Sequence, residues 1–391
     1  MILFEQAYDI VMNSAYTLEK EQIDFKNSLN RVLAEDVVSD IEIPPFTKSA
    51  MDGYACRRKD IKKELTVVET IRAGEIPKKN ISENQCSKIM TGAMLPHGAD
   101  CVLMVEYTKK TDDNKVCYTK DHTNDNIIHK NEDVKSGEIV LKKGTKIKAQ
   151  HIAMLATVGC IRTFVIRQPK VGIISTGDEL VEPNQKPELS QIRNSNAYQL
   201  IAQIQQVGAI PNYFGITKDS KDAIYKTVLK ALHNNDVLIL TGGVSMGDFD
   251  FVLEIMKKTN IKILFDKVAV KPGKPTSFGI AKNKTFFGLP GNPVSSFLQF
   301  ELLAKPFLYK MMDFNYSPFY VKLPMAVEYK RKNVTRKSFI PVTVTKEETV
   351  MPVEYHGSAH LNSLSYADGI IFIQKDENIL KKGEIVNVRQ I

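Results

Sequence analysis

Carboxylates and glycines follow an apolar run in the stretch DVLILTGGVSMGDFDF. The run ends at Gly242 and Gly243, and Ser245, Asp248 and Asp250 come shortly afterwards. Consecutive glycines let backbone amides approach an anion closely. The two aspartates could hold Mg²⁺ opposite that anion, because Mg²⁺ prefers carboxylate and phosphate oxygens. A plain strand-to-helix turn with an aspartate cap is the alternative interpretation.

A second stretch, KVGIISTGDELVEP, repeats this design. Its apolar run ends in Thr176 and Gly177, and Asp178 and Glu179 follow directly. The carboxyl ends of parallel strands meet at one edge of a sheet, where ligands bind. Two acidic glycine turns of this kind therefore predict one shared metal and phosphate site.

A third stretch, FDKVAVKPGKPTSFG, is basic. Lys267, Lys271 and Lys274 surround a Pro-Gly turn and have rigid neighbours. Lysines held in this way suit an oxyanion or a phosphate, to which they offer point charges. A solvated basic turn is the alternative.

Three more turns carry proline or small polar residues. In GLPGNPVSS, Pro290 and Pro293 stiffen a loop and Ser295 opens an apolar helix, whose N-terminus is a natural anion site. Asp52 in SAMDGYA and Thr91 in IMTGA lie in turns of an earlier part of the chain. Turn chemistry alone would explain both of these.

The inventory of reactive groups narrows the chemistry. The chain has no Ser-His-Asp pattern, no cysteine paired with a histidine and no Walker A loop, and its seven histidines are scattered. Carboxylates, lysines, hydroxyls and glycine turns suit phosphates, a divalent metal and an oxyanion, but neither hydride transfer nor acyl transfer. The net charge of +8 fits an anionic small substrate, a nucleic acid or no particular partner.

The elements around these turns predict a multidomain α/β protein, since 391 residues exceed one ordinary core. From residue 170 to about residue 312, apolar strand-like runs alternate with amphipathic helical patterns, as in a doubly wound, mostly parallel sheet. Residues 55–135 contain short β segments. The part from residue 313 returns to short strands, typical of a barrel or sandwich.

Cysteine usage and hydropathy favour a cytoplasmic protein. The chain has no C-x-x-C spacing, which argues against a zinc site or a disulfide framework. The N-terminus lacks a signal-peptide pattern, and no run approaches the roughly 18 apolar residues of a membrane span. The five cysteines are Cys56, Cys86, Cys101, Cys117 and Cys160.

The ordered set of segments resembles the MoeA family of molybdopterin molybdenumtransferases, which is related to the E domain of gephyrin. SAMDGYA, IMTGA, STGDEL, TGGVSMGD, KPGKP and GLPGNPVSS occur in the family's order, and the tail GSAHLNSLSYADGIIFI resembles its C-terminal domain. The resemblance implies insertion of molybdate into adenylylated molybdopterin, with Mg²⁺ and with release of AMP. The expected chemistry is metal-assisted cleavage of a phosphoanhydride.

The resemblance also implies an architecture of four domains. An α/β molybdopterin-binding domain would comprise residues 1–19 and 169–312, and a linker or dimerisation domain residues 20–43 and 136–168. Residues 44–135 would form an inserted β-rich domain and residues 313–391 a C-terminal β-barrel domain. We expect a homodimer whose active cleft lies between the α/β domain of one subunit and the β-rich domains of the other. A molybdopterin-adenylylating enzyme is a further expected partner, whereas nucleic acid and membrane are not.

Residue roles carry over position by position. The catalytic set implied by the resemblance is Asp250, Glu179, Asp219, Lys267, Lys271 and Lys274. The implied metal ligands are Asp248, Asp250 and Glu179. The implied substrate-binding set is Asp52, Thr91, Asp133, Thr176, Gly242, Gly243, Ser245, Pro290, Pro293, Ser295, Arg336 and Ser358.

One segment departs from the family pattern. The stretch IIHKNEDVKSGE has His129 and Lys130 where the family often has an arginine pair, and Asn131 where glycine is usual. Lysine keeps the charge of arginine but loses its bidentate fork. A phosphate-gripping role for this segment is therefore not expected to carry over unchanged.

Two other functions remain open from the sequence. The chain could be a non-catalytic scaffold, because the vertebrate relative pairs this domain with receptor clustering. It could also be the neighbouring adenylyltransferase, whose fold resembles residues 170–310 but lacks the β-rich flanks. The physiological oxyanion could be molybdate or tungstate, since both are tetrahedral dianions of similar size.

Overall fold

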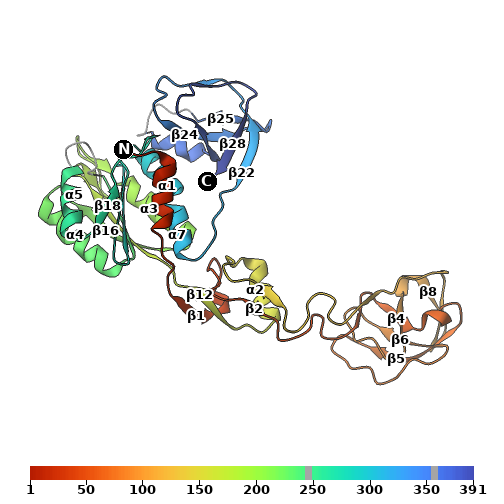
Figure 1. Ribbon diagram of the computed structural model, residues 1–391. Coiled ribbons are helices and arrows are strands. Elements are labelled where there is room, and N and C mark those ends of the chain that lie inside the picture. Colours follow the sequence, from red (N-terminus) through yellow and green to blue (C-terminus); the bar gives the residue numbers. More distant parts are fainter. Residues whose placement is uncertain (243–248, 354–359) are drawn as a thin grey trace.

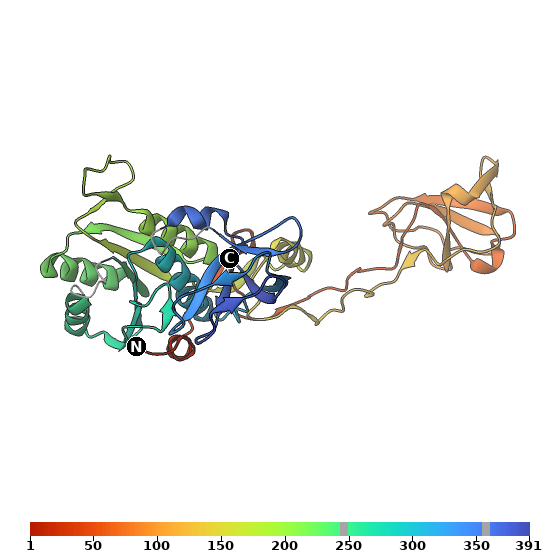
Figure 2. The same ribbon diagram turned by 90° about the horizontal axis from the view of Figure 1, so that it is seen from above.

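The computed structural model describes residues 1–242, 249–353 and 360–391, with the backbone alone for residues 249–253. The molecule is elongated. An α/β domain and a C-terminal sheet lie together at one end, and long connecting segments lead to a separate β-rich unit (Figure 1). Figure 2 shows the same separation from above. Within the described ranges, no helix is long and apolar enough to cross a membrane.

A six-stranded sheet in the order β16-β13-β17-β21-β20-β18 forms the centre of the α/β domain. Its four parallel strands are β16 (Ile210–Thr217), β13 (Lys170–Thr176), β17 (Val237–Thr241) and β21 (Lys284–Leu289). β20 (Ser277–Ala281) completes it by running antiparallel to β21 and to the edge strand β18 (Lys262–Phe265), so β18 points the same way as the four parallel strands. A tight turn at Asn283, with φ 54°, joins β20 to β21 and makes this pair antiparallel. The mostly parallel sheet expected from the sequence is confirmed.

Both faces of this sheet are covered, as a doubly wound sheet requires. On β13, Val171 packs in a core with the buried side of α3 (Ser195–Val207). Ile174 faces the opposite way, into a core that includes residues of α4 (Lys221–Asn234) and α5 (Phe249–Lys258). The alternation of strand side chains therefore supplies two cores from one set of apolar runs.

A helical layer closes the first of these cores. Buried residues of α1 (Phe4–Asn13) join it from the start of the chain. An unbroken helical segment joins it from the other end, comprising α6 (Pro293–Gln299), the π-helical η4 (Phe300–Ala304) and α7 (Lys305–Met311). The sequence-distant ends of the α/β domain thus share one core.

A small linker region follows α1 and precedes β13. Its paired strands are β1 (Lys20–Asp24) with β12 (Arg162–Ile166), and β2 (Val37–Val38) with β11 (Ile139–Leu141). Its helices are η1 (Phe25–Asn27) and α2 (Ala149–Thr157). The chain leaves this region and returns to it, so the β-rich unit is an insertion.

The β-rich unit has its own six-stranded sheet, in the order β7-β4-β6-β5-β9-β8. The strands are β4 (Gly53–Cys56), β5 (Leu65–Ile71), β6 (Gln85–Ile89), β7 (Cys101–Met104), β8 (Thr108–Asp112) and β9 (Lys115–Tyr118). A short pair, β3 (Lys48–Ser49) and β10 (Ile127–Ile128), and the turns η2 (Arg58–Asp60) and η3 (Val105–Tyr107) accompany it. All five cysteines of the chain are free.

The C-terminal sheet has the order β19-β24-β26-β28-β22, with β25 paired to β24. Its strands are β19 (Val270–Lys271), β22 (Tyr320–Pro324), β24 (Lys337–Val344), β25 (Val350–Pro352), β26 (Gly369–Ile373) and β28 (Ile385–Gln390). A separate pair, β23 (Tyr329–Lys330) with β27 (Ile379–Leu380), and the turn η5 (Leu361–Tyr366) complete this part. β19 comes from the middle of the chain, so it ties the α/β domain to the C-terminal sheet.

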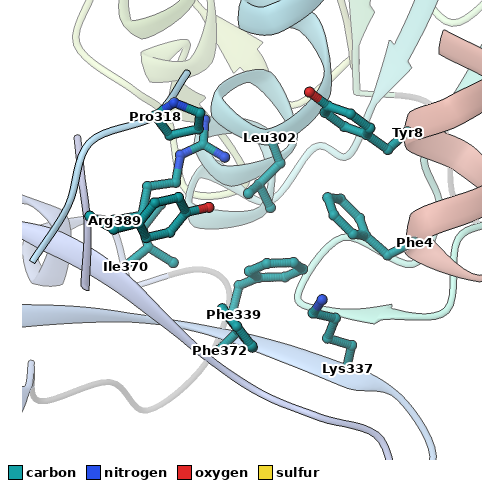
Figure 3. Close-up of a pocket in the computed structure, with 10 residues that line it drawn as sticks. Phe4, Tyr8, Leu302, Pro318, Lys337, Phe339, Ile370, Phe372 and Arg389 are labelled. Carbon is teal, nitrogen blue, oxygen red and sulfur yellow. The ribbon is translucent and has the colours of Figure 1, made fainter. Parts of the chain in front are cut away.

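An aromatic junction joins α1 to the C-terminal sheet around a cavity of about 240 Å³ (Figure 3). The rings of Phe4 and Phe339 meet edge to face, with centroids 5.0 Å apart. Lys337 forms an ion pair with Glu5 at 2.8 Å and lies 4.7 Å from the centre of the Phe372 ring. Ring packing and a partly buried ion pair therefore hold the C-terminal sheet against the α/β domain.

Candidate functional site

A cavity of about 720 Å³ lies where β13, β17 and β21 end. The three strands are parallel, so their carboxyl ends meet at one edge of the sheet. The described residues that line the cavity are Thr176, Gly177, Glu179, Leu180, Ile192, Arg193, Asn194, Ser195, Asn196, Asp219, Thr241, Gly242, Pro275, Pro290, Gly291, Asn292, Pro293 and Leu361. Six residues predicted from the sequence are among them: Thr176, Glu179, Asp219, Gly242, Pro290 and Pro293.

The turn after β13 presents one carboxylate and one hydroxyl to this cavity. Gly177 has φ 146°, and a Cβ built there would lie 2.6 Å from Oε2 of Glu179. Glycine favours this φ, and its lack of a side chain leaves room for the carboxylate of Glu179 to fold back over the turn. Thr176 is almost fully buried, and its Oγ1 has no hydrogen-bond partner within the described chain.

The turn after β17 touches the turn after β13. Gly242 has φ 90°, and a Cβ at this position would lie 2.1 Å from the carbonyl oxygen of Thr176. Gly291, in the loop after β21, also lies against Gly242, because its Cβ would be 3.4 Å from the Gly242 Cα. The structure therefore brings together the two glycine turns that the sequence predicted to share a site.

Two asparagines at the start of α3 hold these turns together. Asn194 caps the helix by accepting the Ala197 N–H at 3.3 Å. Asn196 donates from Nδ2 to Oγ1 of Thr241 at 3.0 Å and to the Gly291 carbonyl at 2.7 Å. The sequence indicated a helix cap here but not a site. Asparagine is common at helix starts whether or not the helix start faces a cavity.

Asp219 brings a second acidic side chain to the cavity wall. It follows β16, and its backbone N–H donates to Oδ1 of Asp178 at 3.2 Å. Asp178 thereby links the turn after β13 to the turn after β16. Glu179 and Asp219, both predicted to be catalytic, thus line one cavity.

The three predicted lysines lie elsewhere. Lys271 and Lys274 are exposed, Lys267 is half-buried, and none of them lines this cavity, although Pro275 does. Lys271 belongs to β19, which pairs with β24 of the C-terminal sheet. Ser295 is buried behind the prolines of its loop and does not line the cavity either. Among the described lining residues, the cation is Arg193, which the sequence did not single out.

Asp52 and Thr91 meet each other in the β-rich unit. The backbone N–H and the hydroxyl of Thr91 donate to Oδ1 of Asp52 at 2.6 and 2.9 Å. The bond from the N–H, and to a lesser extent the bond from the hydroxyl, lower the pKa of the Asp52 carboxyl below its ordinary value. Asp133 is exposed, in the segment that leads back from this unit. The β-rich unit lies far from the cavity of the same chain (Figure 1), so one chain does not unite these residues with Glu179.

The segment that departs from the family pattern is ordered by its own contacts. Lys130 pairs with Glu42 at 2.6 Å, and this lowers the pKa of the Glu42 carboxyl. The His129 N–H donates to Oε2 of Glu132 at 2.7 Å. Asn131 has φ 58°, a conformation that asparagine adopts more readily than other non-glycine residues. Asn131 thus adopts a backbone conformation that glycine also adopts readily.

The remaining predicted residues are described only in part. Arg336 donates from Nη1 to the Val270 carbonyl at 3.0 Å and so links the C-terminal sheet to β19. The backbone of Asp250 lies in α5, but its side chain is outside the description. The described ranges contain no group of three or more His, Cys, Asp or Glu side chains able to hold a metal. Outside the described residues lie Gly243, Ser245, Asp248 and Ser358.

Comparison with known families covers nearly the whole chain. Three models match in order: the MoeA N-terminal region (domain I and II) over residues 2–159, a probable molybdopterin binding domain over residues 172–310, and the MoeA C-terminal region (domain IV) over residues 322–391. The chain belongs to the MoeA family. The part matched by the second model supplies all of the described residues that line the cavity except Leu361, which lies in the part matched by the third.

Full-length relatives of the MoeA family agree with this assignment. The molybdopterin molybdenumtransferase of Staphylococcus epidermidis is 36% identical over 397 residues, covering 99% of this chain and 95% of its own. That of Staphylococcus aureus is 34% identical over 394 residues, covering 98% and 94%. The crystal structure of the molybdopterin biosynthesis MoeA protein of Pyrococcus horikoshii has a TM-score of 0.86 at 30% identity and covers both chains completely. The multidomain α/β fold is therefore that of MoeA proteins.

Proposed function

We propose that this chain inserts molybdate into adenylylated molybdopterin and releases AMP, in a reaction that depends on Mg²⁺. At the coarser level, membership of the MoeA family makes the chain a molybdenumtransferase of molybdenum cofactor biosynthesis, with molybdopterin and molybdenum as substrates. The adenylylated form of the substrate, the release of AMP and the metal are the parts that we propose.

The meeting of the strand-end turns is the observation that carries the proposal. Glu179 and Asp219 face the same cavity as the buried hydroxyl of Thr176 and the backbone of Gly242. Glycine amides and a hydroxyl suit a phosphate, whereas carboxylates suit a cation that would balance its charge. A site with both sets can hold a phosphoanhydride in a fixed orientation, which is most of what its cleavage requires.

The cavity also fits Mg²⁺ in its donor types. Its described acidic groups, Glu179 and Asp219, offer oxygen, the element that Mg²⁺ prefers. We infer that Glu179 and Asp219 hold the ion. When bound, Mg²⁺ would neutralise charge on the phosphates of the substrate. The residues of the chain itself bind and orient the substrate and exclude water from the cleft.

We further propose a homodimer in the cytoplasm, supplied with substrate by a molybdopterin-adenylylating enzyme. Asp52, Thr91 and Asp133 would then face the cavity of the other subunit, because the β-rich unit lies far from its own. Free thiols at all five cysteines are consistent with a reducing compartment.

Metal removal tests the proposed site. Purified protein stripped with a chelator should lose AMP release from adenylylated molybdopterin and molybdate, and added Mg²⁺ should restore it. Glu179→Gln should raise the Mg²⁺ concentration needed for half-maximal rate by about tenfold, the scale of one lost charged contact. Glu188→Gln, in the next loop along the chain and outside the cavity wall, is the matched control. Full activity in the stripped protein would rule out the metal.

A further inference from the structure

Arg193 is exposed at the rim of the cavity, where one hydrogen bond holds its guanidinium. It ends β15 (Ile192–Arg193), which pairs in parallel with β14 (Leu180–Val181). Its Nε donates to the Gln185 carbonyl at 3.1 Å. The two terminal nitrogens have no protein partner within the described chain. A guanidinium held by Nε, with its other donors unused, suits a bidentate contact to an oxyanion.

The groups beside Arg193 favour the same ligand. Asn194 directly follows it and caps α3, and Ser195 and Asn196, the first residues of that helix, line the cavity. The N-terminus of a helix carries partial positive charge and unused backbone N–H groups. Thr176 adds a second, independent sign of a ligand, because this buried residue lines the cavity and its hydroxyl lacks a partner in the described chain. A cation, a helix N-terminus and a hydroxyl donor therefore converge.

Glu182 holds the loop that carries Arg193. Its two carboxylate oxygens accept hydrogen bonds from the hydroxyls of Tyr213 at 2.8 Å and Tyr198 at 3.0 Å. Its backbone N–H donates to the side chain of Gln185 at 3.2 Å, the residue whose carbonyl holds Arg193. The loop of residues 182–191 projects from the α/β domain (Figure 2), and Glu182 fastens its base to α3 and β16.

The same anchor orients the helix cap. Asn194 donates from Nδ2 to the Tyr213 hydroxyl at 2.7 Å and to Oγ of Ser175 at 3.0 Å. Burial first, and then the Glu182 carboxylate, raise the pKa of Tyr213, so its hydroxyl stays protonated and keeps donating to Glu182. Glu182 thus contacts both Gln185, whose carbonyl holds Arg193, and Tyr213, whose hydroxyl holds Asn194 at the start of α3.

We propose that Arg193 binds a phosphate group of the adenylylated substrate and that Glu182 positions Arg193 to do so. This inference rests on the proposed function and adds a phosphate contact to it. The cavity wall otherwise contains the acidic Glu179 and Asp219 among its described residues, so Arg193 supplies the positive charge that a phosphate needs there.

Binding of AMP and of adenosine, measured by calorimetry on the intact protein, tests the contact. Arg193→Gln should weaken AMP binding by about tenfold to a hundredfold, the range for a lost charge-assisted bond. Adenosine binding should be unchanged, because adenosine lacks the phosphate. Arg193→Lys should fall between wild type and Arg193→Gln, since it keeps the charge but loses the fork. Lys186→Gln, an exposed cation in the same loop, should bind AMP like wild type.

Glu182 is tested through its dependence on Arg193. Glu182→Gln should weaken AMP binding about threefold to tenfold in the wild-type background and hardly at all in the Arg193→Gln background. A purely structural role would give equal losses in both backgrounds and would overturn the positioning role. Equal AMP affinity of wild type and Arg193→Gln would overturn the phosphate contact alone. Failure of the wild type to bind AMP would reject the proposed adenylylated substrate and the contact together.

Discussion

At the residue scale, the site depends on a backbone contact that only glycine permits. Gly242 lies against the carbonyl oxygen of Thr176, and this contact joins the turns after β17 and β13. The two turns are far apart in the sequence but touch in the fold. They can approach this closely because residue 242 has no side chain. Any Cβ at residue 242 must push the turns apart.

Gly242→Ala should therefore lower activity sharply and destabilise the α/β domain by about 2–3 kcal/mol, since a clash adds to the cost of the positive φ. Gly74→Ala is the matched control. Gly74 has φ 88° but nothing within 4 Å of an added Cβ. Gly74→Ala should lower the free energy of unfolding by only about 1–2 kcal/mol, the cost of the left-handed conformation itself. Urea unfolding and AMP release measure both variants. Equal effects of the two substitutions would show that the contact has no role.

Single residues of the site were only partly predictable from the sequence. Thr176, Glu179 and Gly242 could be found because each ends an apolar strand, and strand ends meet at one sheet edge. Arg193 and Asn196 could not, because a residue at a helix start has the same pattern whether or not it faces a cavity. The three lysines were assigned to the site from their charge and their Pro-Gly turn alone. The sequence did not reveal that β19, which contains Lys271, joins the C-terminal sheet.

At the element scale, an ion pair aligns the strands that lead to the site. Asp236, just before β17, accepts hydrogen bonds from Arg167 at 2.8 and 3.0 Å and from the Lys170 N–H at 2.8 Å. Burial alone would raise the pKa of this carboxyl, but the Arg167 and Lys170 bonds outweigh it and leave the pKa lowered. The starts of β13 and β17 are thereby fixed relative to each other, and so are their ends at the cavity.

Asp236→Asn should destabilise the α/β domain by about 2 kcal/mol at pH 7, as loss of a charge-assisted pair does. A lowered folded pKa stabilises the protein above the unfolded value of about 3.8, and this stabilisation is lost as pH falls through the folded pKa. The difference between wild type and variant should therefore be constant near neutral pH and shrink below about pH 3.8. Urea midpoints across this range measure it. Asp9→Asn, an exposed site, is the control at pH 7. A difference that stays constant into acid would contradict this role.

The elements themselves were more predictable than the site residues. Continuous apolar runs identified β13 and β17, and amphipathic helical patterns identified α3 and α4, because both faces of the sheet are buried by regular elements. Strand order was not readable in the same way. The reversed direction of β20 depends on the turn at Asn283, which the sequence pattern does not distinguish from another crossover.

At the scale of the whole molecule, the β-rich unit lies at the opposite end from the α/β domain (Figure 1), whose strand ends border the cavity. Motifs in a sequence indicate which residues act, but not how far the connecting segments extend. The structure of one chain therefore leaves Asp52 and Glu179 apart, and the proposed homodimer is what would unite them. The boundaries of the four predicted domains remain a prediction.

Mixing two inactive variants tests this arrangement. Asp52→Asn and Glu179→Gln should each be nearly inactive as homodimers. After joint refolding, about a quarter of all sites should be active, because half of the dimers are mixed and each mixed dimer has one intact cleft. No recovery in a verified mixed dimer would place the whole site within one subunit. An active Asp52→Asn homodimer would exclude Asp52 from the site.

The most direct measurement counts products in a single purified reaction. Adenylylated molybdopterin and molybdate are mixed with the protein and Mg²⁺, and AMP and active molybdenum cofactor are quantified together. Equal amounts of the two products, with neither formed when molybdate is omitted, are the predicted result. Cofactor formed without AMP, or no cofactor from folded, metal-replete protein, would contradict molybdate insertion through the adenylylated substrate.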